Sequence, residues 1–142
     1  MSSLKLLGRD SQDLSIISAS LQDAIIRIQD IAYNKSSRSL SLQLWRYRHE
    51  ADRRERVLCG LRLDNILSLQ SKGISRNDPK AYIVLLSIEF EAGDVTPSGV
   101  IHLNFAGGGT MRLGVEAIDV ILADISDPHI TDKVPLHPDA IL

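Results

Sequence analysis

Alternation of apolar and polar residues dominates the middle of the chain. The stretch SLSLQLWRY, residues 39–47, shows it most clearly, because Leu40, Leu42 and Leu44 fall on one side of an extended backbone. A period of two is typical of strands with one buried face, whereas a helix would spread these residues around its axis. The chain is therefore predicted to consist mainly of antiparallel strands. The predicted runs are residues 24–33, 39–47, 57–69, 81–91, 99–105 and 110–115.

Turn-forming residues separate these runs. The segment NKSSR, residues 34–38, joins the first two runs into a predicted hairpin. Asn65 interrupts the apolar face of 57–69 and predicts a bend or bulge that divides this run, which gives six or seven strands. The residues expected to face the core from the later runs are Tyr82, Val84, Leu86, Ile88, Phe90, Ile101, Leu103, Phe105, Met111, Leu113 and Val115.

Two segments instead have the spacing of amphipathic helices. Residues 10–24 predict a short helix that Asp10 or Ser11 caps, with Asp13 in its first turn to complement the helix dipole. The segment VEAIDVILADI, residues 115–125, predicts a second helix at the carboxyl end of the domain. Its apolar side consists of Val115, Ile118, Ile121, Leu122 and Ile125.

These elements indicate an α+β fold. A mostly antiparallel sheet or barrel of six to seven strands, with a short N-terminal helix and a C-terminal amphipathic helix, has the layout of a pleckstrin-homology-like barrel. A single antiparallel sheet with helices on one face is the alternative. Residues 1–126 are predicted to form one globular domain, and the proline-containing residues 127–142 a loose tail.

The glycine-rich stretch FAGGGT, residues 105–110, could be a phosphate-binding loop or a tight turn. A phosphate loop needs a helix after the glycines and, in its nucleotide form, a following Lys. Here no Lys follows, and residues 110–115 alternate as a strand does. The stretch is therefore interpreted as a hairpin turn, for which glycines at positive φ are well suited.

Composition excludes several classes of protein. A single cysteine, Cys59, rules out an intramolecular disulfide and any multi-cysteine metal site, and it fits a reducing cytoplasm. The N-terminus lacks the apolar core of a signal peptide, and the longest apolar runs are far shorter than a membrane span. The net charge of −2 is uneven, because residues 27–80 are basic and residues 81–142 are acidic.

The segment RYRHEADRRER, residues 46–56, is the most suggestive candidate site. Arginine forks bind phosphates and aromatic rings stack on bases, so the segment could contact an anion or a nucleic acid. Acidic residues are interleaved and leave a charge of only +2, so a solvated, self-paired connection between strands is the alternative. The residues of this possible contact are Arg46, Arg48, Arg53, Arg54, Arg56 and Trp45.

Apolar residues out of phase with the inward sets indicate a second candidate surface. Ile83 and Leu85, with Trp45, either meet another layer of the fold or form a face for a protein partner or a second copy of the chain. Cys59 is in phase with the inward residues, which favours a buried structural thiol over a nucleophile. His102 and Asn104 face outward, and nothing about them indicates an active site. No catalytic residue, cofactor or metal ligand is predicted.

Several segments resemble an uncharacterised bacterial family, domain-of-unknown-function family 2948. They are LQDAIIRIQDIAY, LSLQSKGISR, LLSIEFE and FAGGGTMRLGVEAIDVILADI, and the resemblance covers most of residues 4–126, with the tail outside it. The resemblance implies a small bacterial cytosolic protein and brings no activity, cofactor or functional residue. Together these observations favour a small, soluble, non-enzymatic binding or adaptor module that recognises a protein partner or itself. Nucleic-acid or anionic-ligand binding through residues 46–56 is the alternative, and no membrane is expected.

Overall fold

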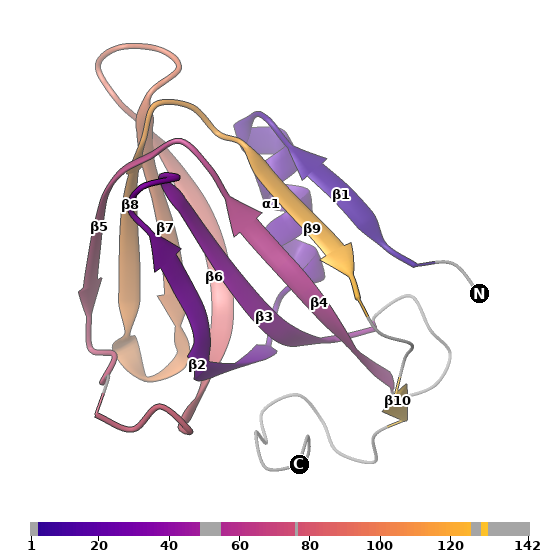
Figure 1. The fold of residues 1–142 in the computed structure, drawn as a ribbon. Coiled ribbons are helices and arrows are strands. Elements are labelled where there is room, and N and C mark those ends of the chain that lie inside the picture. The colour runs from indigo at the N-terminus through magenta and orange to yellow at the C-terminus, as the bar shows by residue number, and fades with distance from the viewer. Residues whose placement is uncertain (1–2, 49–54, 76, 126–128, 131–142) are drawn as a thin grey trace.

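The protein is a strongly curved antiparallel sheet with one α-helix packed at one side of it (Figure 1). The computed structural model describes residues 3–48, 55–75, 77–125 and 129–130. In this part of the chain the elements are β1 (Lys5–Gly8), α1 (Ser11–Ser20), β2 (Ala24–Asn34), β3 (Ser39–Tyr47), β4 (Glu55–Leu63), β5 (Ile66–Lys72), β6 (Tyr82–Ala92), β7 (Gly99–Phe105), β8 (Thr110–Val115), β9 (Val120–Asp124) and β10 (His129–Ile130).

Nine strands form one continuous path in the order β1-β9-β4-β3-β2-β6-β7-β8-β5, and the short β10 pairs with β4. Strands β1 and β5 are therefore the two ends of the path. All pairings are antiparallel, as predicted, and the predicted hairpin of β2 and β3 is present. The predicted break at Asn65 is also confirmed, because this residue has φ 61° and separates β4 from β5.

Helix α1 forms where the sequence predicted it. The Oδ1 atom of Asp10, the N-cap, accepts a hydrogen bond of 2.7 Å from the backbone N–H of Asp13. Leu14, Ile17 and Leu21 at this helix are 0–1% exposed and belong to the core. The helix packs against β6 and β1, so it fills the space between one end of the sheet and its middle.

The inward residues of most strands are those predicted from alternation. Leu40, Leu42 and Leu44 of β3 are 0–2% exposed, and the directly opposed Leu61 and Leu63 of β4 are equally buried. The aliphatic core is consistent with the low aromatic content of the chain. Burial of this alternating set is what stabilises the sheet against the helix.

The glycine-rich stretch is a hairpin turn, as predicted. Gly107 and Gly108 have φ values of 85° and 92°, a region that residues with a side chain rarely adopt. The N–H of Phe105 donates to the carbonyl oxygen of Gly109 at 2.8 Å and closes the turn between β7 and β8.

The predicted C-terminal helix over residues 115–125 is wrong. Residues Val120–Asp124 instead form β9, which lies between β1 and β4 in the sheet. Val120 and Leu122 face the core at 0–1% exposure, whereas Ile125, which the helix would have buried, is 56% exposed, so the segment follows a period of two. The available edges of β1 and β4 decide in favour of the strand, because tertiary pairing overrides a short local pattern.

The fold-class prediction is corrected accordingly. The described chain has one helix and a nine-strand path with a short tenth strand, not six to seven strands with two helices. A pleckstrin-homology-like layout requires a closing helix, and β9 occupies its place in the sequence. The α+β description holds only in the broad sense of a sheet with a helix against it.

The predicted inward phase of β6 is also wrong in its first half. The register shifts between Leu85 and Ser87, which marks a bulge. A bulge adds one residue to one strand and reverses its alternation. Leu85 is consequently buried at 1% exposure, whereas Leu86, expected to face the core, is 42% exposed.

Within the described residues, no helix is both long and apolar enough to cross a membrane.

Candidate functional site

A gap in the curved sheet lies between β2 and β5. Strand β2 pairs with β6 only through Ala24–Arg27. This ladder ends at Tyr82, the first residue of β6, and β2 is irregular beyond it, because it runs from Ile26 to Ile31 while β3 runs only from Leu44 to Leu42. Strand β5 is the end of the strand path, and no pairing joins it to β2 (Figure 1).

The gap is bounded at both ends by backbone hydrogen bonds. The N–H of Ile66, at the start of β5, donates to the carbonyl oxygen of Arg38 at 3.0 Å. The N–H of Gln29 donates to the carbonyl oxygen of Pro79 at 2.8 Å. The opening is therefore a window of limited length, which we call the β2–β5 window.

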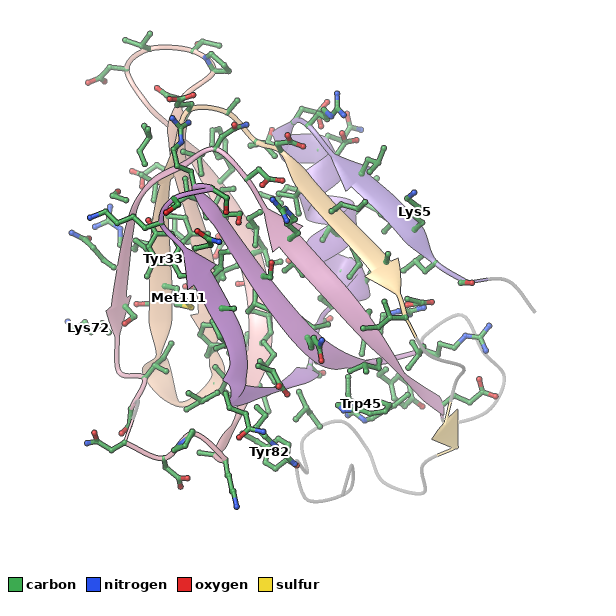
Figure 2. All side chains as sticks on the ribbon, viewed as in Figure 1. Lys5, Tyr33, Trp45, Lys72, Tyr82 and Met111 are labelled. Atoms are coloured by element: carbon green, nitrogen blue, oxygen red, sulfur yellow. The ribbon has the colours of Figure 1, made fainter. Side chains whose placement is uncertain are left out.

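The window leads to a largely apolar cavity of about 420 Å³. Leu40 and Met111, which are 0% and 5% exposed, connect it with the core, and Tyr33, 38% exposed, lies towards solvent. Tyr33 and Met111 lie between β5 and β2 (Figure 2). A cavity of this size and character is typical of a binding site. Its lining residues are Ile28, Gln29, Ile31, Tyr33, Leu40, Leu69, Ser71, Ile74, Pro79 and Met111.

Sequence reasoning did not identify this site. Its residues come from four strands and a loop, and the apolar ones on the strands, taken alone, resemble ordinary core residues. The one local signal is in β2, where Ile28, Ile31 and Tyr33 do not keep a single alternating phase. Such an irregularity indicates a bulge, and bulges often occur beside functional sites.

The two ends of the strand path differ in how they present their backbone. Strand β1 is four residues long, begins with Lys5 and packs against α1. Strand β5 is seven residues long and carries no charge before Lys72. Short length and charge protect a strand edge from pairing with other chains, so β5 is the less protected edge.

A second hollow, of about 480 Å³, lies on β2, β3, β4 and β9. Small residues such as Gly60 and Ala123 line it and leave the space unfilled. Ile125, also in its lining, is 56% exposed. This hollow is more open to solvent than the cavity behind the β2–β5 window. The strands beneath it are paired on both sides, except for β2 beyond Arg27. It therefore offers less to a ligand than the window does.

The arginines of the predicted basic patch that the structure describes are buried or mostly buried. Arg46 is 1% exposed, and its Nε and Nη2 donate to the two carboxylate oxygens of Asp124 at 2.9 Å each. Arg48 is mostly buried and contacts the Glu55 carboxylate at 2.6 Å. Arg53 and Arg54 lie outside the described residues.

Arg56 is buried in a different environment. Its Nη1 donates to the carbonyl oxygen of Trp45 at 3.1 Å, and its guanidinium lies 5.9 Å from the ring centre of Tyr47. Its Nε and Nη2 are buried without a hydrogen-bond partner among the described residues. Burial lowers the pKa of Arg56, and Asp23 and Tyr47 act against that effect.

The residues predicted to form a partner face are mostly inside the protein. Leu85 is 1% exposed and belongs to the core, and Ile83 is partly buried against it. Trp45 is partly buried at the lower end of the sheet in Figure 2. In this fold, Leu85 is not available to a partner.

Cys59 is a buried structural thiol, as predicted. It is 0% exposed, and its Sγ donates to the carbonyl oxygen of Leu44 at 3.4 Å. Burial raises the pKa of the Cys59 thiol well above its usual value, so the thiolate needed for nucleophilic chemistry is disfavoured. In the described part of the chain, no three His, Cys, Asp or Glu side chains are grouped as metal ligands would be.

His102 and Asn104 lie side by side on β7 within a polar network. The His102 ring nitrogen Nε2 is 3.0 Å from a carboxylate oxygen of Glu91. The Asn104 amide donates to Ser87 and to Glu89, at 3.0 and 2.7 Å. These contacts link β6 to β7, and neither His102 nor Asn104 lines one of the hollows described above.

Comparison with known proteins gives one match. The model of the family described as "Protein of unknown function (DUF2948)" matches residues 4–137. This match includes residues 127–137, which the sequence resemblance had left outside the family. No curated protein and no solved structure matches the chain.

Proposed function

Since this chain belongs to the family of unknown function DUF2948, whose description gives no activity, we propose from the site itself that it is a non-enzymatic module that binds a protein partner. The partner contributes a short extended segment, which lies along β5 and places one apolar side chain in the β2–β5 window. The observation that carries this proposal is a strand edge that carries no charge before Lys72 and lies beside a largely apolar cavity.

The edge of β5 supports the backbone part of the recognition. An extended peptide gains affinity by adding its hydrogen bonds to an unpaired strand edge. Within the described chain, β5 pairs only with β8. The hydrogen bonds at Ile66 and Gln29 close the ends of the window, which limits the added segment to a few residues.

The cavity supports the side-chain part. Leu69 and Met111 provide apolar contact area, and Gln29 and Ser71 are the polar groups of the lining that could fix orientation. Interfaces depend most strongly on a few anchors that fill such pockets. An aliphatic or aromatic side chain of the partner is therefore the expected anchor.

A peptide selection with matched variants tests the proposal. Random displayed peptides are selected on the full chain, and their affinity is measured for Leu69→Lys and Leu67→Lys. Leu69 lines the cavity, whereas Leu67 on the same strand is 57% exposed and does not line it. We expect the Leu69 variant to lose at least about tenfold in affinity, equal to roughly 1.4 kcal/mol, and the Leu67 variant to lose little.

Two results would contradict this function. One is that no peptide is enriched, and the other is that both lysine variants bind the enriched peptides as the unchanged protein does. Native mass spectrometry distinguishes a second copy of the chain from another protein as the partner, since a self-pairing edge gives dimers that Leu69→Lys dissociates.

Nucleic-acid binding through residues 46–56 stays a prediction that the described arginines do not favour. Arg46 and Arg48 already contact carboxylates of the protein. A cytoplasmic location and a bacterial source likewise stay predictions from the sequence.

A further inference from the structure

The guanidinium of Arg56 is buried, and two of its nitrogen atoms, Nε and Nη2, have no hydrogen-bond acceptor among the described residues. Arg56 alternates with the inward Val57 and Cys59 along β4, so its side chain lies on the outer face of the sheet, directly opposite Tyr47 of β3. The side chain is 1% exposed. Figure 2 shows Trp45, whose carbonyl oxygen accepts the Nη1 hydrogen bond, at the same end of the sheet.

The Nε–Nη2 edge of Arg56 has the geometry of an oxyanion-binding site. Nε and Nη2 of a guanidinium point in parallel from one side of its plane and match two oxygens of a carboxylate or phosphate. Arg46 uses this same edge to hold Asp124 at 2.9 Å from each atom. In Arg56 both atoms are buried and have no partner among the described residues.

Buried donors without acceptors are uncommon because each one loses its hydrogen bonds to water. We propose that the Nε–Nη2 edge of Arg56 binds an oxyanion, a carboxylate or phosphate group, through two parallel hydrogen bonds. The ring of Tyr47 forms one wall of this site, and its contact with the guanidinium fixes the plane in which the oxyanion lies.

Two sources can supply this chemistry. Strand β10 pairs His129 with Arg56 and Ile130 with Glu55, so the chain continues into residues 131–142 from a position beside the site. That segment contains Asp132 and Asp139. A small anion such as inorganic phosphate is the other source.

Nuclear magnetic resonance of the arginine Nε–Hε groups tests the proposal on the full-length protein. Inorganic phosphate is titrated at constant ionic strength, and the Arg56 signal is assigned by its loss in Arg56→Lys. A free-anion source predicts a saturable shift of the Arg56 signal, with half-saturation at a roughly tenfold lower concentration than at Arg62. Arg62 is the internal control because it is half exposed and already contacts Asp64.

The second arm uses the full-length variant Asp132→Asn, Asp139→Asn. If the chain's own carboxylates occupy the edge, the Arg56 Hε signal moves upfield in this variant without added phosphate, and the unchanged protein does not respond to phosphate. Either result supports the proposal and identifies the source. An Arg56 signal that responds neither to phosphate nor to the two substitutions overturns it. If Arg56→Lys does not fold, the Arg56 signal is assigned through the connected resonances of its own side chain and backbone, so the readout remains decisive.

Discussion

Arg46 and Arg56 are both about 1% exposed, yet their guanidinium groups differ in whether a hydrogen-bond acceptor faces the Nε–Nη2 edge. The Nε–Nη2 edge of Arg46 meets both oxygens of Asp124, on the inner face of the sheet. The same edge of Arg56, on the outer face, meets no acceptor in the described chain. The contact with Asp124 explains why Arg46 is buried, whereas the free Nε–Nη2 edge of Arg56 is the basis for the oxyanion site proposed above.

Asp124 also explains why Arg46 is part of the framework and not of a binding patch. Its Oδ2 accepts from the N–H of Leu4 at 2.8 Å, and its own N–H donates to the Leu4 carbonyl oxygen at 2.9 Å. One carboxylate thus connects β3, β9 and the chain just before β1. The electrostatic pair holds together segments that are far apart in the sequence.

The largest expected effect comes from breaking the paired site. Asp124→Asn keeps the shape of the side chain and removes its charge, so the buried Arg46 loses the carboxylate that its Nε and Nη2 both contact. We expect the free energy of unfolding to fall by about 3–5 kcal/mol in chemical denaturation.

The matched control replaces both partners, as Arg46→Met with Asp124→Leu. Removal of both charges leaves neither member of the pair as a buried ion without the other, so the double variant should recover at least half of the loss. If Asp124→Asn costs less than about 1 kcal/mol, the ion pair is not what distinguishes Arg46 from Arg56.

A smaller effect is expected at Cys59, which lies beside the paired arginine. Arg46 lowers the pKa of the thiol and Asp124 raises it, so their opposing effects leave burial as the dominant cause of the raised pKa. Below the usual thiol pKa of 9.0 both states keep the proton. Above it the unfolded chain loses the proton and the folded chain keeps it, so the free energy of unfolding falls as the pH rises.

The predicted slope is about 1.4 kcal/mol per pH unit above pH 9. Denaturation curves between pH 8 and roughly pH 10 measure it, with Cys59→Ala as the variant that lacks this contribution. If the free energy of unfolding falls equally with pH in the two proteins, the pKa of the Cys59 thiol is not raised by folding. The effects of Arg46 and Asp124 on that pKa would then not cancel as stated above.

The features that the sequence predicted correctly are those that depend on residues close together in the chain. The alternation of β3, the cap at Asp10 and the turn at Gly107 each follow from local chemistry, and the structure confirms them. The spacing of residues 115–125 suits a helix and a strand equally, and only the edges of β1 and β4 decide between them.

The sites depend on contacts between distant residues, which is why they were not predicted. Arg46 and Asp124 are 78 positions apart, and no local pattern distinguishes an arginine that faces a carboxylate from one that faces solvent. The β2–β5 window likewise depends on pairing between distant segments, because the ladder between β2 and β6 ends at Arg27 and β5 pairs with β8 and not with β2. A basic segment was visible in the sequence, but its surroundings were not.

The smallest effect is expected at an exposed pair, which serves as the outer reference for the comparison. Arg38 Nη2 lies 2.8 Å from a carboxylate oxygen of Glu116, and both side chains are about half exposed. Water and salt screen such a pair, so Glu116→Gln should change the free energy of unfolding by less than about 0.5 kcal/mol. The contact distance is similar to that of Arg46 with Asp124, so a small effect here and a large one there would identify burial, not proximity, as the cause. A loss above about 1 kcal/mol at Glu116 would mean that exposed pairs also hold this sheet together, and burial would then not be the cause of the large effect expected at Asp124.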